Sequence, residues 1–235
     1  PGTGDGSVST LSRGNTANNA STRMLANMPS DEDIIFELQY LVRCKGVDAF
    51  WNLRAFFMSG DVEFDGKIDR GDLKDGLICW GISMDPRYLD RAIDVADSKR
   101  TNGVIDFNRF MQLLRGEIPL HREELVARVW ESLDSDGAGS VPVTQLNERF
   151  NSENHPLTTL GQASRDTVWQ QFRLLTRNRR NNEMSNSNLK AKVVVVTRSE
   201  FADYYADLSA GLSSASSADA ESDGYFEQVI TSNWN

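Results

Sequence analysis

The sequence predicts an all-α fold built from helix–loop–helix units, and three observations lead to that prediction. Apolar residues recur at helical spacing through most of the chain from residue 31 onward. The apolar segments are separated by polar loops that contain glycine and end on a β-branched residue. The chain has 235 residues, of which 39% are hydrophobic, enough for one large domain or two small ones with a real core.

Residues 1–30 are the exception to this plan. They are rich in Gly, Ser, Thr and Asn and carry only three charged side chains. Such a segment cannot bury enough apolar surface to offset the entropy lost on ordering. We therefore expect an extended N-terminal tail that becomes ordered only where it lies against another protein chain.

The first helix is predicted to begin after Ser30, which opens the capping-box pattern S-D-E-D ahead of an apolar helical face. The same helix is predicted to end near Gly46. The remaining helices are expected, in chain order, near 47–59, 70–80, 86–96, 107–115, 121–133, 143–150, 164–177 and 198–208. Eight helices in four pairs predict two lobes, 31–118 and 119–235. Each loop should add one very short strand, paired with that of its neighbour. Four aromatic residues ahead of the first loop are expected in the core of its lobe: Phe50, Trp51, Phe56 and Phe57.

The first loop, DVEFDGKIDRGD at 61–72, has the layout of an EF-hand calcium loop, with a turn glycine at Gly66 and a strand residue at Ile68. Its expected metal ligands are Asp61, Glu63, Asp65, the backbone carbonyl of Lys67, Asp69 and Asp72. The last ligand is one methylene shorter than the usual glutamate, which favours six-coordination and hence weaker Ca²⁺ binding or Mg²⁺. The alternative is an acidic turn on an EF-hand scaffold that binds no ion.

The other three loops lack most ligands. The second, at 98–109, has Arg109 where a bidentate carboxylate belongs, so we expect no ion there. The third, at 134–145, keeps only Asp134 and Asp136 among its carboxylates and should be empty or very weak. The fourth keeps Glu200 at its last place but has an insertion in place of acidic ligands. The sequence therefore predicts at most one metal site.

That insertion is basic in a chain of net charge −9. The cationic side chains in and beside it are Arg173, Arg177, Arg179, Arg180, Lys190 and Lys192. One interpretation is a solvated loop, and the other is a docking patch for an acidic partner such as the tubulin surface. Nucleic acid is disfavoured by the net charge and by the lack of aromatic residues among these arginines.

With its four helix pairs and its C-terminal end, the chain resembles the calcyphosin family of EF-hand proteins. The resemblance rests on the four-pair layout, on the end RSEFADYYADLSAGLSSASSADAESDGYFEQVITSNW at 198–234, and on the connector NSENHP at 151–156. It covers roughly residues 40 to 235 and implies two lobes of two EF-hands each, with calcium binding in typical members. It also implies links to signalling and, for several relatives, to cilia and flagella. The final segment should form a helix that lies in the groove of the second lobe.

Two functions from different classes follow. The first is a structural adaptor in a microtubule assembly such as a ciliary or flagellar axoneme, and the second is a calcium sensor or buffer working through loop 61–72. No nucleophile elbow, phosphate loop or zinc-protease helix occurs, so we expect no enzyme. No apolar run reaches membrane-spanning length. Cys44 and Cys79 are expected to be reduced and to behave as small apolar residues, which fits a cytoplasmic, cytoskeletal protein.

Overall fold

The computed structural model describes residues 29–60, 66–97, 103–153, 155–176, 194–212 and 219–234. Nearly all of the predicted tail lies outside these ranges, so its contacts stay a prediction. The all-α prediction is confirmed. In the first half the elements are α2 (Asp31–Arg43), α3 (Ala49–Gly60), β1 (Lys67–Asp69), α4 (Arg70–Cys79), α5 (Pro86–Ala96), β2 (Val104–Asp106) and α6 (Phe107–Arg115). In the second half they are α7 (Leu120–Leu133), β3 (Ser140–Pro142), α8 (Val143–Arg149), α9 (Pro156–Thr159), α10 (Arg165–Leu175), β4 (Val195–Thr197), α12 (Arg198–Leu212) and α13 (Asp219–Asn233).

The first helix begins where its capping box predicts. The Ser30 hydroxyl accepts a hydrogen bond from the Asp33 N–H over 3.1 Å, and the Asp33 carboxylate accepts one from the Ser30 N–H over 3.2 Å. These two bonds satisfy backbone donors that the first turn of a helix leaves unpaired. Three acidic residues in that turn also complement the helix dipole. Local sequence alone therefore sets the start of α2.

Each predicted loop strand is present and paired. β1 and β2 are antiparallel with Ile68 opposite Ile105, and β3 and β4 are antiparallel with Val141 opposite Val196. The turn into β1 requires a positive φ, which Gly66 adopts at 62° without the strain that a side chain would cause. The strand pairs tie the loops of each lobe side by side.

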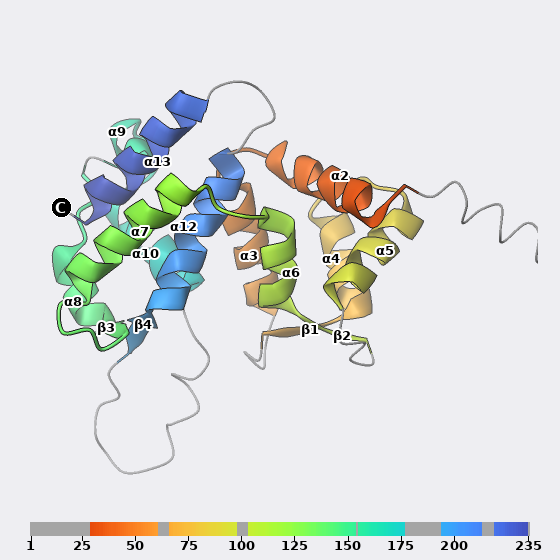
Figure 1. Cartoon of the computed structure of the whole chain (residues 1–235), viewed down its shortest axis with the longest axis horizontal. Helices are drawn as coiled ribbons and strands as arrows, with labels where there is room; N and C mark the ends of the chain where they lie inside the picture. The colour runs from red at the N-terminus through yellow and green to blue at the C-terminus, as the bar shows by residue number, and fades with distance from the viewer. Residues whose placement is uncertain are drawn as a thin grey trace, which may run out of the picture.

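The core consists of two hydrophobic clusters. One gathers side chains from α2 to α6, and the other gathers side chains from α7 to α13. Figure 1 shows the two corresponding groups of helices side by side, with α3 and α12 between them. α12 is buried on all sides along its last two turns, because it contacts α3 and α6 as well as α7, α10 and α13. It is the central helix of the molecule.

Two fully packed residues belong to the cluster of the opposite half. Trp51 of α3 belongs to the second cluster, and Ala210 of α12 belongs to the first. The expectation that four aromatics before the first loop form the core of their own lobe is therefore correct for Phe50 and Phe57 only. Phe56 is 40% exposed, and Trp51 crosses to α12. The halves share α3 and α12 instead of meeting at a solvated linker.

α13 packs on the second half. Phe226, Val229 and Ile230 are fully buried there, and the helix contacts α7, α12 and α9. The first half of α13 is held by Arg122, a buried residue of α7. Arg122 donates a hydrogen bond to Asp223 over 2.7 Å and lies over the Phe226 ring. α13 is therefore part of the second hydrophobic core, while its place in a target-helix groove stays a prediction.

Three further differences from the sequence-based expectations concern local structure. The short helix α9 was not predicted. α12 runs four residues past its predicted end at residue 208, because its last turn is buried between the two halves. Cys44 and Cys79 are free but exposed, so the expectation that they behave as apolar residues is wrong.

Among the described residues, none of the helices has the length and apolar character that spanning a bilayer requires.

Candidate functional site

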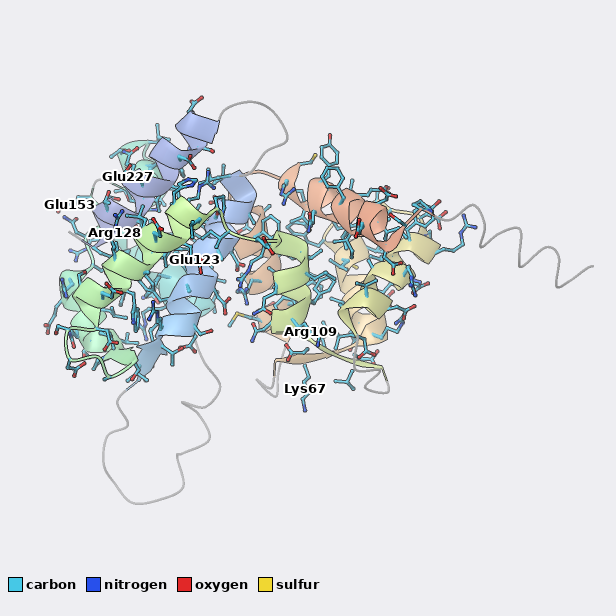
Figure 2. The ribbon with its side chains drawn as sticks, in the orientation of Figure 1. Lys67, Arg109, Glu123, Arg128, Glu153 and Glu227 are labelled. Atoms are coloured by element: carbon cyan, nitrogen blue, oxygen red, sulfur yellow. The ribbon has the colours of Figure 1, made fainter. Side chains whose placement is uncertain are left out.

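The candidate metal loop, 61–72, is described only in its second half. Lys67, whose carbonyl is an expected ligand, lies in β1, and Figure 2 shows its side chain extending away from the β1–β2 ribbon. Asp69 caps α4 by accepting a hydrogen bond from the Gly71 N–H over 2.7 Å through Oδ1. Asp72 lies in the first turn of α4. Asp61, Glu63 and Asp65 lie outside the described residues.

The described part of this loop suits an oxygen-ligated cation. Carboxylates follow the Gly66 turn at the ninth and twelfth places, as an EF-hand requires. Within the described ranges, no three His, Cys, Asp or Glu side chains come together in a way that could hold a metal. Because half of the expected ligands fall outside those ranges, the six-ligand site stays a prediction.

The second loop keeps the EF-hand backbone without its chemistry. Gly103 has a φ of 88°, and Ile105 is 1% exposed in the first cluster. Arg109 stands at the place of the bidentate ligand and is exposed in the first turn of α6. Its backbone N–H donates to the Asp106 carboxylate, which caps the helix, over 3.1 Å. Ser98 and Arg100 lie outside the described residues. The described half of the loop therefore offers a cation where an ion would need a carboxylate.

The third loop is held in shape by its own hydrogen bonds. Asp134 Oδ2 accepts from the Gly139 N–H over 2.9 Å, and Asp136 Oδ1 accepts from the Ala138 N–H over 3.2 Å. Gln145, at the twelfth place, directs its amide towards the Leu133 carbonyl at 3.5 Å. Asp134 Oδ1 is buried and accepts no hydrogen bond from the described residues. Two carboxylates, of which only one has a buried oxygen without a hydrogen bond, are too few ligands for a dehydrated Ca²⁺ ion.

In the fourth unit, the twelfth-place glutamate has become a helix cap. Glu200 Oε2 accepts hydrogen bonds from both the N–H and the hydroxyl of Thr197 over 2.7 Å. The Thr197 hydroxyl in turn accepts from the Glu200 N–H over 3.3 Å, which completes a capping box. The carboxylate that would chelate an ion thus fixes the start of α12.

The basic cluster is described at one residue. Arg173 lies exposed in the last turn of α10, at the base of the insertion. Arg177, Arg179, Arg180, Lys190 and Lys192 lie outside the described residues. Their role as a docking patch stays a prediction.

A buried network of charges joins the two halves where α3, α6 and α12 meet. Arg54 donates to both carboxylate oxygens of Asp207, over 2.5 and 3.2 Å, and to the Asn108 amide oxygen over 3.0 Å. Arg115 donates to Asp207 over 3.3 Å and to Asp203 over 2.5 Å. One carboxylate of the last EF-hand helix is thus shared by two arginines of the first half.

The centre of this network, the Arg54–Asp207 pair, is buried, and Arg54 keeps its charge there. Asp207 is 0% exposed and Arg54 is 5% exposed. Burial lowers the pKa of Arg54, but the charge and hydrogen bonds of Asp207 and the charge of Asp203 raise that pKa by more. The guanidinium therefore stays protonated, in the bidentate geometry that gives the strongest protein ion pairs.

Aromatic and backbone contacts extend the junction on either side of the network. The Trp51 ring stacks on Tyr204 with 4.6 Å between centroids, and its Nε1–H donates to the Tyr204 carbonyl over 2.9 Å. Further along α12, a Cβ placed on Gly211 would lie 2.0 Å from the Val47 carbonyl oxygen. The helix reaches that backbone only because residue 211 has no side chain.

Sequence reasoning missed this junction, although a signal is present. Arg54 interrupts the aromatic segment AFWNLRAFF, and Asp207 interrupts the apolar segment YYADLSAGL. Charged residues are almost never fully buried unless they are paired. A single positive and a single negative charge in two apolar helical faces therefore predict a buried pair.

Comparison with known proteins places the chain among calcium-binding proteins. No protein-family model matches it. Crustacean calcium-binding protein 23 of Faxonius limosus is 22% identical over 190 residues, which cover 81% of this chain and 85% of that protein. Probable calcium-binding protein CML17 of Arabidopsis thaliana is 31% identical over 113 residues, which cover 45% of this chain and 68% of that protein. Probable calcium-binding protein CML11 of Oryza sativa is 30% identical over 117 residues, which cover 48% of this chain and 55% of that protein. With its paired helix–loop–helix units, this chain belongs to the EF-hand family of calcium-binding proteins.

Proposed function

We propose that this EF-hand protein is a non-catalytic structural adaptor of a microtubule assembly, such as a ciliary or flagellar axoneme. In this proposal it has at most one working Ca²⁺ or Mg²⁺ site, in loop 61–72. One observation carries the proposal: the two halves are joined through a buried ion-pair network on α3, α6 and α12. The resemblance of residues 198–234 to calcyphosins supports the ciliary setting.

The junction restricts how far the two halves can open. A sensor of the calmodulin type opens each lobe when ions bind and exposes an apolar groove for a target helix. Here α13 covers the second half with three fully buried side chains, and α2 covers α5 and α6 of the first half. Opening either half would also have to work against the contacts that join α3 to α12. A fixed body that positions partners suits this geometry better than a mobile sensor does.

The basic cluster supplies the partner chemistry in this proposal. Arg173 is exposed at the end of α10, directly before the stretch that contains Arg177, Arg179, Arg180, Lys190 and Lys192. Arginine pairs well with carboxylates, and an acidic surface such as that of tubulin would meet this cluster favourably. The rest of the chain is acidic overall, so attraction to such a surface has to come from this segment.

Co-sedimentation with taxol-stabilised microtubules in the presence of a chelator tests the adaptor proposal. We expect the wild-type protein to pellet with microtubules without added calcium. The triple variant Arg177→Glu, Arg179→Glu, Arg180→Glu should lose most of this binding. The matched control Arg109→Glu, Arg128→Glu, Arg149→Glu changes the net charge by the same amount at three exposed sites and should still bind. Equal binding by both triple variants would refute the role of the insertion.

The alternative is a calcium sensor or buffer that acts through loop 61–72 on a signalling partner. The carboxylates of Asp69 and Asp72 after the Gly66 turn favour it, as do relatives named for calcium binding. Calorimetric titration with Ca²⁺ and with Mg²⁺ separates the two functions. Micromolar Ca²⁺ affinity that is lost in Asp61→Ala and kept in Asp134→Ala would support the sensor. Absence of binding below millimolar concentrations would end it.

A further inference from the structure

The outer side of α2 carries an apolar stripe that nothing in the described part of the chain covers. We call the exposed residues Asp33, Phe36, Glu37, Tyr40 and Cys44 the α2 outer face. Phe36 is 61% exposed and Tyr40 is 49% exposed, one helical turn apart. The other exposed large apolar side chains among the described residues stand singly on their helices, strands or loops. Figure 1 shows α2 along the outer edge of the first group of helices.

The fold does not need these two aromatic side chains. The opposite face of α2 buries Ile34, Leu38 and Val42 completely against α5 and α6, which accounts for the docking of the helix. Tyr40 instead lies beside Cys44, whose hydrogen bond and charge raise the tyrosine pKa. Apolar side chains that adjoin one another on a surface mark interaction sites more often than isolated ones do.

Charge narrows the choice of partner. α2 carries four acidic residues and one basic residue, Arg43 in its last turn, so it is acidic on balance. Asp31 is paired with Arg91 over 2.7 Å, and Asp33 serves the helix cap. Glu37, which follows Phe36 in the sequence and is exposed, has no ion pair with any described residue. Such a surface repels nucleic acid, anionic lipid and acidic protein surfaces, and it attracts a basic partner.

We propose that the α2 outer face docks a basic amphipathic helix of a partner protein. Phe36 and Tyr40 present two rings at the spacing of one helical turn, which an aliphatic side chain of a second helix can pack between. A Lys or Arg on that helix would pair with Glu37 or lie over an aromatic ring. This surface is separate in the sequence from the basic cluster at 173–192 and takes a partner of the opposite charge. The protein would then link an acidic partner to a basic one.

Peptide binding to the full chain tests this proposal. The probe is a fluorescein-labelled 14-residue peptide of leucine and lysine with its leucines at helical spacing, measured by fluorescence anisotropy at physiological salt. We expect Phe36→Ser with Tyr40→Ser to weaken binding by about tenfold, as loss of central aromatic anchors does. Leu120→Ser with Leu160→Ser, at side chains that are 69% and 67% exposed, is the matched control and should change it less than about twofold.

Charge reversal gives a second comparison that does not depend on removing the aromatics. Glu37→Lys should weaken peptide binding by about fivefold, while Glu227→Lys, on the exposed side of α13 far from α2, should leave it unchanged. Equal effects of the α2 and control variants would overturn the proposal, as would no peptide binding at all. Binding to phosphatidylserine vesicles that requires Phe36 and Tyr40 would overturn it in favour of a membrane surface.

Discussion

Breaking the Arg54–Asp207 pair should destabilise the whole molecule and not one half alone. Asp207→Ala leaves the Arg54 guanidinium, 5% exposed, with only the neutral amide of Asn108, while Arg115 keeps Asp203. Removing one partner of a buried pair costs about 3–5 kcal/mol of unfolding free energy, because the remaining charge is stranded out of water. For a chain of this size that corresponds to a fall in melting temperature of roughly 6–20 °C.

The assay is urea unfolding followed by circular dichroism and by tryptophan fluorescence. Wild type should unfold in one transition by both probes, because the halves share α3 and α12. A double-mutant cycle with Arg54→Met and Asp207→Leu isolates the pair: each single change should be costly, and the double variant should recover much of the loss. The control is Arg91→Ala, which removes a pair whose side chains are 48% and 46% exposed, and which should cost less than about 1 kcal/mol. If Asp207→Ala costs no more than Arg91→Ala, the junction is not what joins the halves.

Three further predictions concern single sites. Gly211→Ala should destabilise by more than about 2 kcal/mol in urea unfolding, because its Cβ would meet the Val47 carbonyl, whereas Gly224→Ala on α13 meets nothing and should be neutral or stabilising by up to about 1 kcal/mol. Burial lowers the pKa of His155 to about 4 from 6.5, so the unfolded chain binds the extra proton between these values and stability is lost as the pH falls from 6.5 to 4. That loss is about 3 kcal/mol, and it should disappear from the pH dependence of melting in His155→Asn, which keeps a capping acceptor. Arg122→Ala removes the hydrogen bond to Asp223 and should speed amide hydrogen exchange in α13 more than in α7; equal protection of α13 in variant and wild type would show that Arg122 does not hold that helix in place.

The sequence predicted local structure better than it predicted the junction. Short-range chemistry determines the capping box of Ser30 and Asp33, the turn at Gly66 and the paired loop strands. These features can be predicted from neighbouring residues, and the structure confirms all three. The extent of α12 depends instead on what lies around it. Nothing local in the sequence stops that helix at residue 208 or carries it to 212, because its last turn is held by contacts with α3 and its neighbours.

The candidate metal loop could be predicted from a local motif, whereas the buried ion pair could not. The spacing of carboxylates in loop 61–72 follows a motif, so its ligands can be named from sequence, although Asp61, Glu63 and Asp65 lie outside the described residues. The Arg54–Asp207 pair joins residues 153 positions apart, and no periodicity links them. In the sequence, Arg54 and Asp207 can be recognised only because each is a charged residue within an apolar helical segment. Pairing them requires the topology that brings α3 against α12.

The acidic residues that the third and fourth loops keep accept hydrogen bonds from within the chain. Asp134 now bonds the Gly139 backbone within its own loop, and Glu200 caps α12 through Thr197. These bonds hold the turn and the helix start without the charge of an ion. The strand pair Val141–Val196 then keeps both loops in register, and α13 and the Arg54–Asp207 pair fix the helices that follow. These contacts hold the described part of the second half without a bound ion, which is why they support the proposed adaptor function over the sensor alternative.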